Sequence, residues 1–337
     1  MTLPVRQLGP FQVSAIGLGC MNLSHAYGSP PPIEQSAAII SRAIELGINH
    51  LDTAALYGFG VNESLLGKVL GPLRSKVVLA SKCGMTGVDG KRTINGRPEV
   101  LKRTCEEALM RLNTDVIDLY YLHRVDRNVP LEESMGALVD LVREGKVRAL
   151  GLSEVSAATL RRAHAIQPIA AVQNEYSLWT REPEIALLDE CRRLNVAFVA
   201  FSPLARGFLT CKIRDLNFTE RDIRRVMPRF QPENFSRNVA LLDPYEALAR
   251  EAGCTPAQLA LAWLLAKSEN IVPIPGTTRI EHLEENVGAV SVKLSNAIVR
   301  RVEALINQDT VSGARYIEAT QREIDTETFP TKERAQS

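Results

Sequence analysis

Short apolar runs alternate with amphipathic stretches along most of this chain. A continuous apolar run is typical of a buried parallel strand, and apolar residues three and four positions apart are typical of one helix face. The runs predict eight strands, at residues 15–19, 48–54, 77–82, 116–123, 147–153, 170–173, 196–201 and 271–274. The amphipathic stretches predict helices at residues 34–46, 63–70, 98–112, 131–143, 156–164, 183–194 and 281–287. This alternation favours a parallel sheet covered by helices.

Individual residues mark where several of these helices begin or end. Gly47 is suited to end the helix 34–46, because glycine readily adopts the left-handed conformation of a helix C-terminus. Asn62, Ser156 and Thr255 are predicted to cap the helices that follow them, since their side chains can accept a hydrogen bond from the first turn.

Eight strand–helix pairs without a repeat of the first half predict one (β/α)8 barrel, an α/β fold. The competing interpretation is a doubly wound sheet, which would carry the motif G-x-G-x-x-G directly after its first strand. Here Gly17 and Gly19 supply only the first two glycines, and a loop with three prolines at 30–32 follows in place of a helix. We therefore expect the barrel, as a single domain over residues 1–337.

Several segments fall outside the regular alternation. Residues 5–14 predict a β-hairpin before the barrel, with Gly9 and Pro10 at its turn. Residues 205–238, after the seventh strand, form a polar connection that is too long for an ordinary one, and we expect it to be a functional loop. Helices are predicted at 238–252, 256–266 and, as an extra C-terminal helix, 295–306. Residues 309–337 are expected to be a partly irregular tail.

Composition narrows the class of protein. The chain has 337 residues, 45% of them hydrophobic and 23% charged, and a net charge of +1. That balance offers no basic footprint for nucleic acid, and no apolar run is long enough to span a membrane. The N-terminus lacks the layout of a signal peptide, and the six cysteines include no C-x-x-C pair. We therefore expect a cytoplasmic protein with reduced thiols, without nucleic-acid, membrane or metal partners.

Four polar residues stand at or just beyond predicted strand ends: Asp52, Tyr57, Lys82 and His123. Side chains at the carboxyl ends of barrel strands converge on one face. A carboxylate, a phenol, an ammonium and an imidazole gathered there would form a proton-transfer site. Taken singly, each residue has a structural alternative, because strand-end tyrosines pack, Lys–Asp pairs form salt bridges and isolated histidines are often structural.

A series of motifs at these strand ends resembles the aldo-keto reductases, from the N-terminal hairpin to about residue 316. The matching segments are 52–58 (DTAALYG), Lys82, 118–123 (DLYYLH), 151–153 (GLS), 173–176 (QNEY), 201–204 (FSPL) and 274–279 (IPGTTR). Segments 19–21 (GCM), 228–235 (PRFQPENF) and 313–316 (GARY) are most similar to the bacterial, fungal and plant reductases of the pyridoxal-reductase type. This resemblance implies an oxidoreductase that reduces aldehydes and ketones to alcohols by reversible hydride transfer.

The resemblance assigns a role to each of the four residues. Tyr57 would be the general acid that protonates the carbonyl oxygen. A phenol has a pKa near about 10, and the Lys82 ammonium would bring that pKa closer to the working pH. Asp52 would hold Lys82 charged and in place. His123 would donate to the carbonyl oxygen and orient the substrate.

The hydride must come from a cofactor, because no side chain supplies one, and the resemblance implies a nicotinamide dinucleotide. By resemblance, Ser153 and Gln173 would bind its carboxamide, Phe201 would stack on its ring, and the remaining contacts would come from Ser202, Leu204, Gly207, Gly276, Thr277, Arg279, Glu285 and Asn286. Thr277 and Arg279 would meet the 2′-phosphate of NADP(H). Gly276 and His282 stand where a better-known branch has cations, which leaves Arg279 as the remaining fixed cation of this cluster. One guanidinium can bind a phosphate bidentately, so NADP(H) is preferred and NAD(H) remains possible.

The substrate pocket is the least defined part of the sequence. His25, Tyr27, Trp179 and Phe208 fall on loops above the strand ends and are expected to supply its apolar walls. Arg124 directly follows His123, and we weigh two roles for it: attraction of an anionic substrate, or a surface salt bridge. The physiological carbonyl, the direction of the reaction and the oligomeric state are left open.

Two other functions fit parts of this pattern. Potassium-channel β subunits share the same barrel fold and bind a nicotinamide cofactor, but they act chiefly as regulatory subunits by associating with a partner protein. A Schiff-base aldolase would use Lys82 as a nucleophile, with substrate trapped on it by borohydride. Steady NADPH turnover with simple aldehydes would favour the reductase over both.

Overall fold

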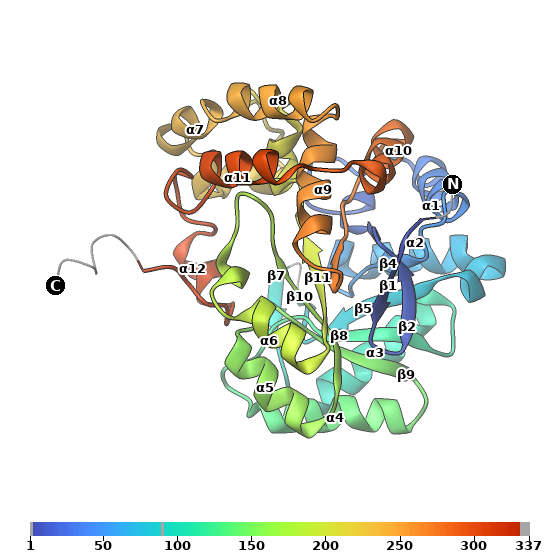
Figure 1. The fold of residues 1–337 in the computed structure, drawn as a ribbon. Helices are drawn as coiled ribbons and strands as arrows, with labels where there is room; N and C mark the ends of the chain where they lie inside the picture. Colours follow the sequence, from blue (N-terminus) through green and yellow to red (C-terminus); the bar gives the residue numbers. More distant parts are fainter. Residues whose placement is uncertain (1–2, 89–90, 331–337) are drawn as a thin grey trace.

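The computed structural model describes residues 3–88 and 91–330 (Figure 1). Its central feature is an eight-stranded sheet in the order β12-β11-β10-β9-β8-β5-β4-β3, in which every neighbouring pair is parallel. The strands are β3 (Leu18–Gly19), β4 (His50–Asp52), β5 (Val78–Cys83), β8 (Ile117–Leu122), β9 (Val147–Ser153), β10 (Ile169–Glu175), β11 (Ala197–Phe201) and β12 (Ile271–Pro273). Spatial order follows chain order, as in a barrel.

Backbone hydrogen bonds join the first strand to the last and close the barrel. Gly17 N donates to Pro273 O at 3.0 Å, and Gly19 N donates to Pro275 O at 3.3 Å. The approach needs glycine, because a Cβ on Gly19 would lie 2.7 Å from Ile274 O. These bonds confirm the predicted barrel and exclude the doubly wound alternative.

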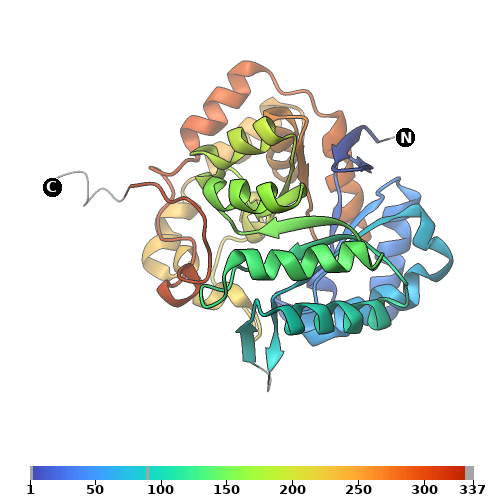
Figure 2. The ribbon, with the colours of Figure 1, turned by 90° about the horizontal axis from the view of Figure 1, so that it is seen from below.

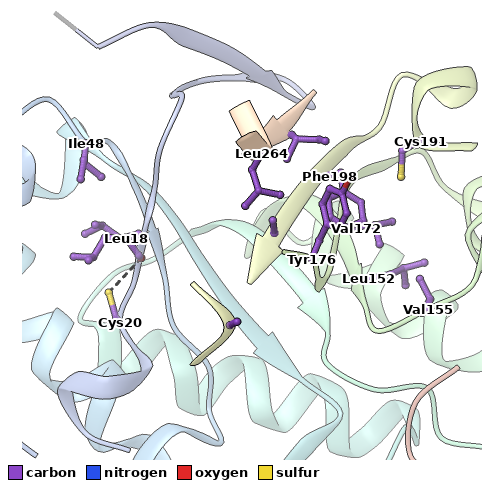
Figure 3. Close-up of a cluster of buried hydrophobic side chains, with 14 of the residues drawn as sticks. Leu18, Cys20, Ile48, Leu152, Val155, Val172, Tyr176, Cys191, Phe198 and Leu264 are labelled. Carbon is purple, nitrogen blue, oxygen red and sulfur yellow. Dashed lines mark hydrogen bonds between the residues drawn. The ribbon is translucent and has the colours of Figure 1, made fainter. Parts of the chain in front are cut away.

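Helices surround the barrel, as the two ribbon views show (Figures 1 and 2). They are α1 (Ile33–Glu45), α2 (Val61–Leu70), α3 (Pro98–Leu112), α4 (Leu131–Arg143), α5 (Ala157–Ile166), α6 (Leu187–Leu194), α7 (Pro232–Val239), α8 (Leu242–Glu251), α9 (Pro256–Lys267), α10 (Ile280–Gly288) and α11 (Asn296–Leu305). Their apolar faces pack on the outside of the sheet, where Tyr176, Phe198 and Val172 lie together in Figure 3. The Tyr176 ring meets the Phe198 ring edge-on, with centroids 5.7 Å apart.

The N-terminal hairpin closes one end of the barrel, as β1 (Val5–Leu8) pairs antiparallel with β2 (Phe11–Ser14). Leu8 and Val13 are fully buried, in one cluster with the inward side chains of Leu119 and Val199. Arg6 anchors the hairpin by donating to the carbonyls of Leu265, Ser268 and Ile271. Hydrophobic burial and this cationic anchor together seal the end opposite the predicted site.

Helix boundaries confirm two predicted caps and correct a third. The hydroxyls of Ser156 and Thr255 accept from the first turns of α5 and α9. The prediction for Asn62 was wrong, because α2 begins at Val61, two residues before the predicted start, with Gly60 at its N-cap. The Asn62 side chain is buried instead, donating to Cys20 O at 2.8 Å and accepting from Thr53 Oγ1 at 2.6 Å.

Other connections contain short elements that the sequence pattern did not predict. A second hairpin, β6 (Met85–Val88) and β7 (Lys91–Ile94), follows β5 and projects from the body at the lower edge of Figure 2. The predicted helix 183–194 is divided into a 3-10 turn, η4 (Glu182–Glu184), and α6. Further 3-10 turns are η1 (Met21–Leu23), η2 (Tyr57–Gly60), η3 (Gly71–Lys76), η5 (Ala205–Thr210), η6 (Ile223–Val226), η7 (Pro228–Phe230) and η8 (Ala289–Ser291).

The C-terminal segment is anchored to the start of α5 after a short helix, α12 (Glu318–Gln321). The Asp325 carboxylate accepts from Ser156 Oγ at 3.1 Å and from Thr159 Oγ1 at 2.5 Å. Glu327 accepts from the Ala157 backbone N–H at 2.7 Å. Carboxylates at a helix N-terminus are electrostatically favourable, so these contacts tie the tail to the barrel. In the part of the chain described, no helix is long and apolar enough to cross a membrane.

Replacing Leu8 with alanine tests the role of the hairpin as a plug. Leu8→Ala removes a fully buried side chain from the end of the barrel, and we expect the free energy of unfolding to fall by about 2–5 kcal/mol. Val5→Ala on the same strand is the control, because Val5 is 60% exposed and should change stability by less than about 0.5 kcal/mol. Urea denaturation of both variants measures the difference, and equal losses would refute the plug.

Candidate active site

A cavity of about 580 Å³ opens at the carboxyl ends of the barrel strands. Asp52, His123, Ser153 and Gln173 line it from the ends of β4, β8, β9 and β10. Loops that follow the strands complete its wall. A pocket of this size is typical of a site for small molecules and cofactors.

The four predicted catalytic residues meet at this cavity. Lys82 is fully buried, and its Nζ lies 2.5 Å from Asp52 Oδ1 and 2.8 Å from Thr53 O. The same Nζ donates to the Tyr57 hydroxyl at 3.2 Å. The His123 ring lies edge-on to the Tyr57 ring, with centroids 6.0 Å apart. Tyr57, Asp52 and His123 line the cavity, and Lys82 lies behind them.

A sharp backbone turn places Tyr57 in this group. The Tyr57 N–H donates to Ala54 O at 3.0 Å, which folds the chain directly after β4. Gly58 and Phe59 then adopt positive φ values of 59° and 52°. A glycine at the first of these positions avoids the steric cost that other side chains carry there. The turn therefore returns the Tyr57 ring toward the strand ends.

Burial governs the protonation of these groups. Burial raises the pKa of Tyr57 above its ordinary value, because it outweighs the opposing effect of the Lys82 charge. The sequence predicts that the Lys82 charge lowers the pKa of Tyr57. That effect is present, but the effect of burial is larger, so the pKa is raised overall. Burial lowers the pKa of Lys82, but attraction to Asp52 and Tyr57 outweighs it and leaves the pKa raised. Tyr57 is thus a protonated phenol, and Lys82 an ammonium, at neutral pH.

His123 is uncharged at neutral pH. Burial, followed by the nearby charges of Arg124 and Lys82, holds its pKa well below the ordinary histidine value. Its Nδ1 is buried and makes no hydrogen bond within residues 3–88 and 91–330. A neutral imidazole beside the Tyr57 phenol can donate a hydrogen bond to an oxygen without releasing a full charge.

Gln173 contacts the catalytic group from the far side of the barrel. Its Nε2 donates to Asp52 Oδ2 at 2.6 Å, so Asp52 uses one oxygen for Lys82 and the other for Gln173. This contact was missed in the sequence, where Gln173 was assigned only to the cofactor. The two residues are 121 positions apart along the chain, and no local pattern links them.

The cavity contains most of the side chains predicted to bind the cofactor. It is lined by Ser153, Gln173, Phe201, Ser202, Leu204, Gly207, Gly276, Thr277, Glu285 and Asn286. Arg279 is not part of the lining; its side chain is 61% exposed and pairs with Glu281 at 3.4 Å. Thr210 and Lys212 also line the cavity, and Lys212 makes no ion pair with any described residue. This elongated set of hydroxyls, backbone and one free cation fits a dinucleotide with its phosphates.

The predicted substrate residues divide into two groups. His25 and Tyr27 line the cavity. The predictions for Trp179 and Phe208 were wrong, because these rings pack on each other at 3.8 Å between centroids, and Phe230 packs on Trp179 at 5.6 Å. The long loop after β11 packs Phe208 and Phe230 against Trp179 of the loop after β10, and all three side chains are buried in the main hydrophobic core.

Several residues that line the cavity were not predicted. They come from the β6–β7 hairpin, the long loop and the C-terminal segment, and include Met85, Arg92, Arg206, Arg224, Tyr316, Ile317 and Thr320. The charge and length of the loop at 205–238 were the available signals for Arg206 and Arg224. The hairpin and the C-terminal segment reach the cavity wall only through long-range folding, and no local sequence pattern predicts that position.

Two loops meet above the cavity. Ile223 N donates to Ala26 O at 2.9 Å, and Tyr27 and Asp222 form an isolated antiparallel bridge. Arg224 pairs with Asp222 at 2.6 Å and lies over the Tyr27 ring at 5.1 Å from the centroid. The long loop is therefore fastened to the loop after β3 across the mouth of the cavity.

A buried ion cluster supports the neighbouring wall. Arg206 and Arg315 both donate to Glu175 Oε2, at 2.7 and 2.9 Å, and Arg315 also pairs with Glu154. Although burial opposes ionisation of Glu175, the surrounding arginines prevail and lower its pKa to about 2. Arg315 stacks near the Phe201 ring, 6.0 Å from its centroid. The C-terminal segment is thereby held against the end of β11.

Two named relatives match nearly the whole chain. "Probable aldo-keto reductase 1" of Glycine max is 46% identical over 309 residues, covering 91% of this chain and 89% of that protein. "Aldo-keto reductase yakc [NADP(+)]" of Schizosaccharomyces pombe is 43% identical over 324 residues, covering 94% and 95%.

Solved structures and a family model agree with these relatives. The glycerol dehydrogenase AKR11B4 from Gluconobacter oxydans superposes with a TM-score of 0.82 at 27% identity, over 97% of this chain and 98% of its own. The holo form of aldo-keto reductase AKR11C1 from Bacillus halodurans gives 0.74 at 27% identity, over 94% and 99%. The model of the Aldo/keto reductase family matches residues 15–307. The chain therefore belongs to the aldo/keto reductase family, whose members are oxidoreductases acting on carbonyl compounds.

Proposed function

We propose that this protein reduces aldehydes or ketones to alcohols with NADPH, using Tyr57 as the general acid. One observation carries the proposal: the Tyr57 hydroxyl lies 3.2 Å from the buried Lys82 ammonium, at the wall of a cavity that hydroxyls, backbone groups and the Lys212 cation also line. A phenol in that position can donate a proton, and the ammonium beside it stabilises the phenolate that remains.

Each side chain has a defined part in the proposed reaction. Tyr57 donates its proton to the carbonyl oxygen as negative charge develops there. Neutral His123 donates a hydrogen bond to the same oxygen and orients the carbonyl. Asp52, held by Gln173, keeps Lys82 charged and within reach of Tyr57. The low-dielectric surroundings of this buried group strengthen each of these interactions.

A nicotinamide dinucleotide bound in the cavity would supply the hydride. Ser153 and Gln173 would hold its carboxamide, and Phe201 would present an aromatic face to its ring. Lys212, Thr210 and the backbone at Gly207 would bind its phosphates. Thr277 and Arg279 would bind a 2′-phosphate, for which the guanidinium must exchange its exposed partner Glu281. The relative from Schizosaccharomyces pombe is named for NADP(+), which supports NADPH over NADH.

Tyr57→Phe tests the general acid. Loss of the proton donor should lower kcat for carbonyl reduction by about 10²–10⁴-fold while NADPH binding changes little. Stopped-flow absorbance at the NADPH band and a fluorescence titration measure the two quantities. Tyr245→Phe is the matched control, since it removes a buried hydroxyl that bonds Pro256 O at 2.8 Å, away from the cavity. Near-normal turnover by Tyr57→Phe would remove Tyr57 from the mechanism.

Lys82→Met tests the tuning of Tyr57. The Lys82 charge lowers the pKa of Tyr57 against the effect of burial, so its removal should raise that pKa further. The acid must be protonated, and the alkaline fall of kcat/KM for reduction should therefore move to higher pH, with a lower plateau. The pH profile of kcat/KM measures the shift. If the plateau value of kcat/KM fell but the pH of its alkaline decrease stayed the same, Lys82 would not set the pKa of the acid.

Arg279→Ala tests the choice of nicotinamide cofactor. Loss of the charge should weaken NADPH about tenfold and NADH much less, because only NADPH carries the 2′-phosphate. Dissociation constants from fluorescence titration give the comparison. Arg301→Ala removes another exposed arginine, paired with Glu251 at 2.6 Å, and should affect neither cofactor. Equal weakening of NADPH and NADH by Arg279→Ala would exclude a 2′-phosphate contact.

A further inference from the structure

Arg124 is a buried cation at the wall of the active-site cavity. It follows His123 directly after β8, and only 9% of its surface is exposed. It lines the same cavity as Tyr57 and His123. The burial excludes the surface salt bridge that the sequence offered as one of its two roles.

The hydrogen bonds of Arg124 leave its charge uncompensated. Its Nη1 donates to His123 O at 2.6 Å and to Ser153 Oγ at 3.4 Å, and both acceptors are uncharged. Its Nε is buried and has no hydrogen-bond partner among the described residues. A guanidinium has five N–H donors in a planar fork suited to a carboxylate, so donor capacity remains.

Carboxylates near this part of the fold are occupied elsewhere. Asp126 accepts from the backbone of Gly96 at 3.0 Å and of Asn128 at 2.9 Å. Arg92, the other cation on this side, pairs with Glu323. Across residues 3–88 and 91–330, no carboxylate oxygen lies within the 4.0 Å ion-pair distance of Arg124. Arg206 and Arg315, which are buried to a similar degree, are both neutralised by Glu175.

Burying a guanidinium without a counterion is costly, and proteins ordinarily pair such groups. Glu175 neutralises Arg206 and Arg315, whereas no carboxylate among the described residues pairs with Arg124. Arg124 lines the cavity, so a molecule bound there can reach its guanidinium. An anionic group on the substrate would supply the missing counterion.

We propose that Arg124 selects carbonyl substrates that carry a carboxylate, binding that carboxylate while Tyr57 and His123 bind the carbonyl oxygen. This inference rests on the proposed reductase function and specifies its substrate class. Arg124 adjoins His123, so the carboxylate and the carbonyl belong to one small molecule. The role is one of binding and specificity, and the proton still comes from Tyr57.

Matched acids and esters test this selectivity. The substrates are 4-carboxybenzaldehyde with methyl 4-formylbenzoate, and phenylglyoxylate with methyl phenylglyoxylate, which place the charge at a longer and a shorter distance from the carbonyl. With NADPH, the wild-type enzyme should prefer at least one acid over its ester in kcat/KM. Arg124→Gln should reduce that acid-to-ester ratio by about ten- to a hundredfold, the range expected for a hydrogen-bonded charge. Arg124→Lys should retain part of the preference.

Two further variants serve as controls. Arg92→Gln changes another cation that lines the cavity, which already has Glu323 as its partner, and should alter the ratio by less than about threefold. Arg143→Gln removes an arginine that is 77% exposed, and should leave the ratio unchanged. Loss of the preference in Arg92→Gln but not in Arg124→Gln would overturn the assignment. If Arg124→Gln lowered kcat/KM equally for acid and ester, the proposal would be overturned, and Arg124 would only hold His123 and Ser153 in place.

Inhibition of the wild-type enzyme gives a second measurement that does not depend on folding of the variants. Benzoate should compete with the aldehyde, and uncharged benzamide should inhibit at least about tenfold more weakly. Equal inhibition by the two, or competition of benzoate with NADPH alone, would overturn the inference. Reduction of esters as readily as acids would overturn it and leave the reductase function standing. No reduction of any of the four substrates would overturn both.

Discussion

The ion pair between Asp52 and Lys82 is the constraint on which the active site depends. It joins the ends of β4 and β5 inside the barrel, where neither charge reaches water. Two buried charges persist only when their geometry is good and their remaining hydrogen-bonding capacity is filled. Thr53 O and the Tyr57 hydroxyl fill it for Lys82, and Gln173 fills it for Asp52. The Tyr57 hydroxyl is thus one of the hydrogen-bond partners that stabilise the buried ion pair.

This pair also requires the closed barrel. Gln173 reaches Asp52 from β10, which lies four places away from β4 in the strand order but faces it when the sheet curls. The curl is completed by the bonds of Gly17 and Gly19 to the chain around β12. Closure of the barrel therefore also completes the hydrogen bonding of Asp52. The active site thus requires the fully closed barrel.

Residues at strand ends were the predictable part of the site. Local apolar runs place Asp52, Lys82 and His123 at one edge, because strand direction is fixed once the barrel is chosen. The single-domain boundaries and the assignment to the pyridoxal-reductase type stay predictions. Trp179 and Phe208 were misplaced because their rings pack together across two different loops, after β10 and after β11, and no local pattern marks that contact. Asn62 has the side chain of a helix cap, but its buried contacts with Cys20 and Thr53 are long-range and leave no local pattern.

The two anchors of the C-terminal segment divide the molecule into parts with different tolerance for evolutionary change. Arg315 fixes the segment to Glu154 and Glu175, and Asp325 fixes it to α5. The residues between these points include Tyr316, Ile317 and Thr320 of the cavity wall. Insertions or substitutions confined to this span would reshape the wall while the barrel and its buried charges stay as they are. Such a span lets descendants of one ancestral gene diverge in the molecules they accept without renewed selection on folding.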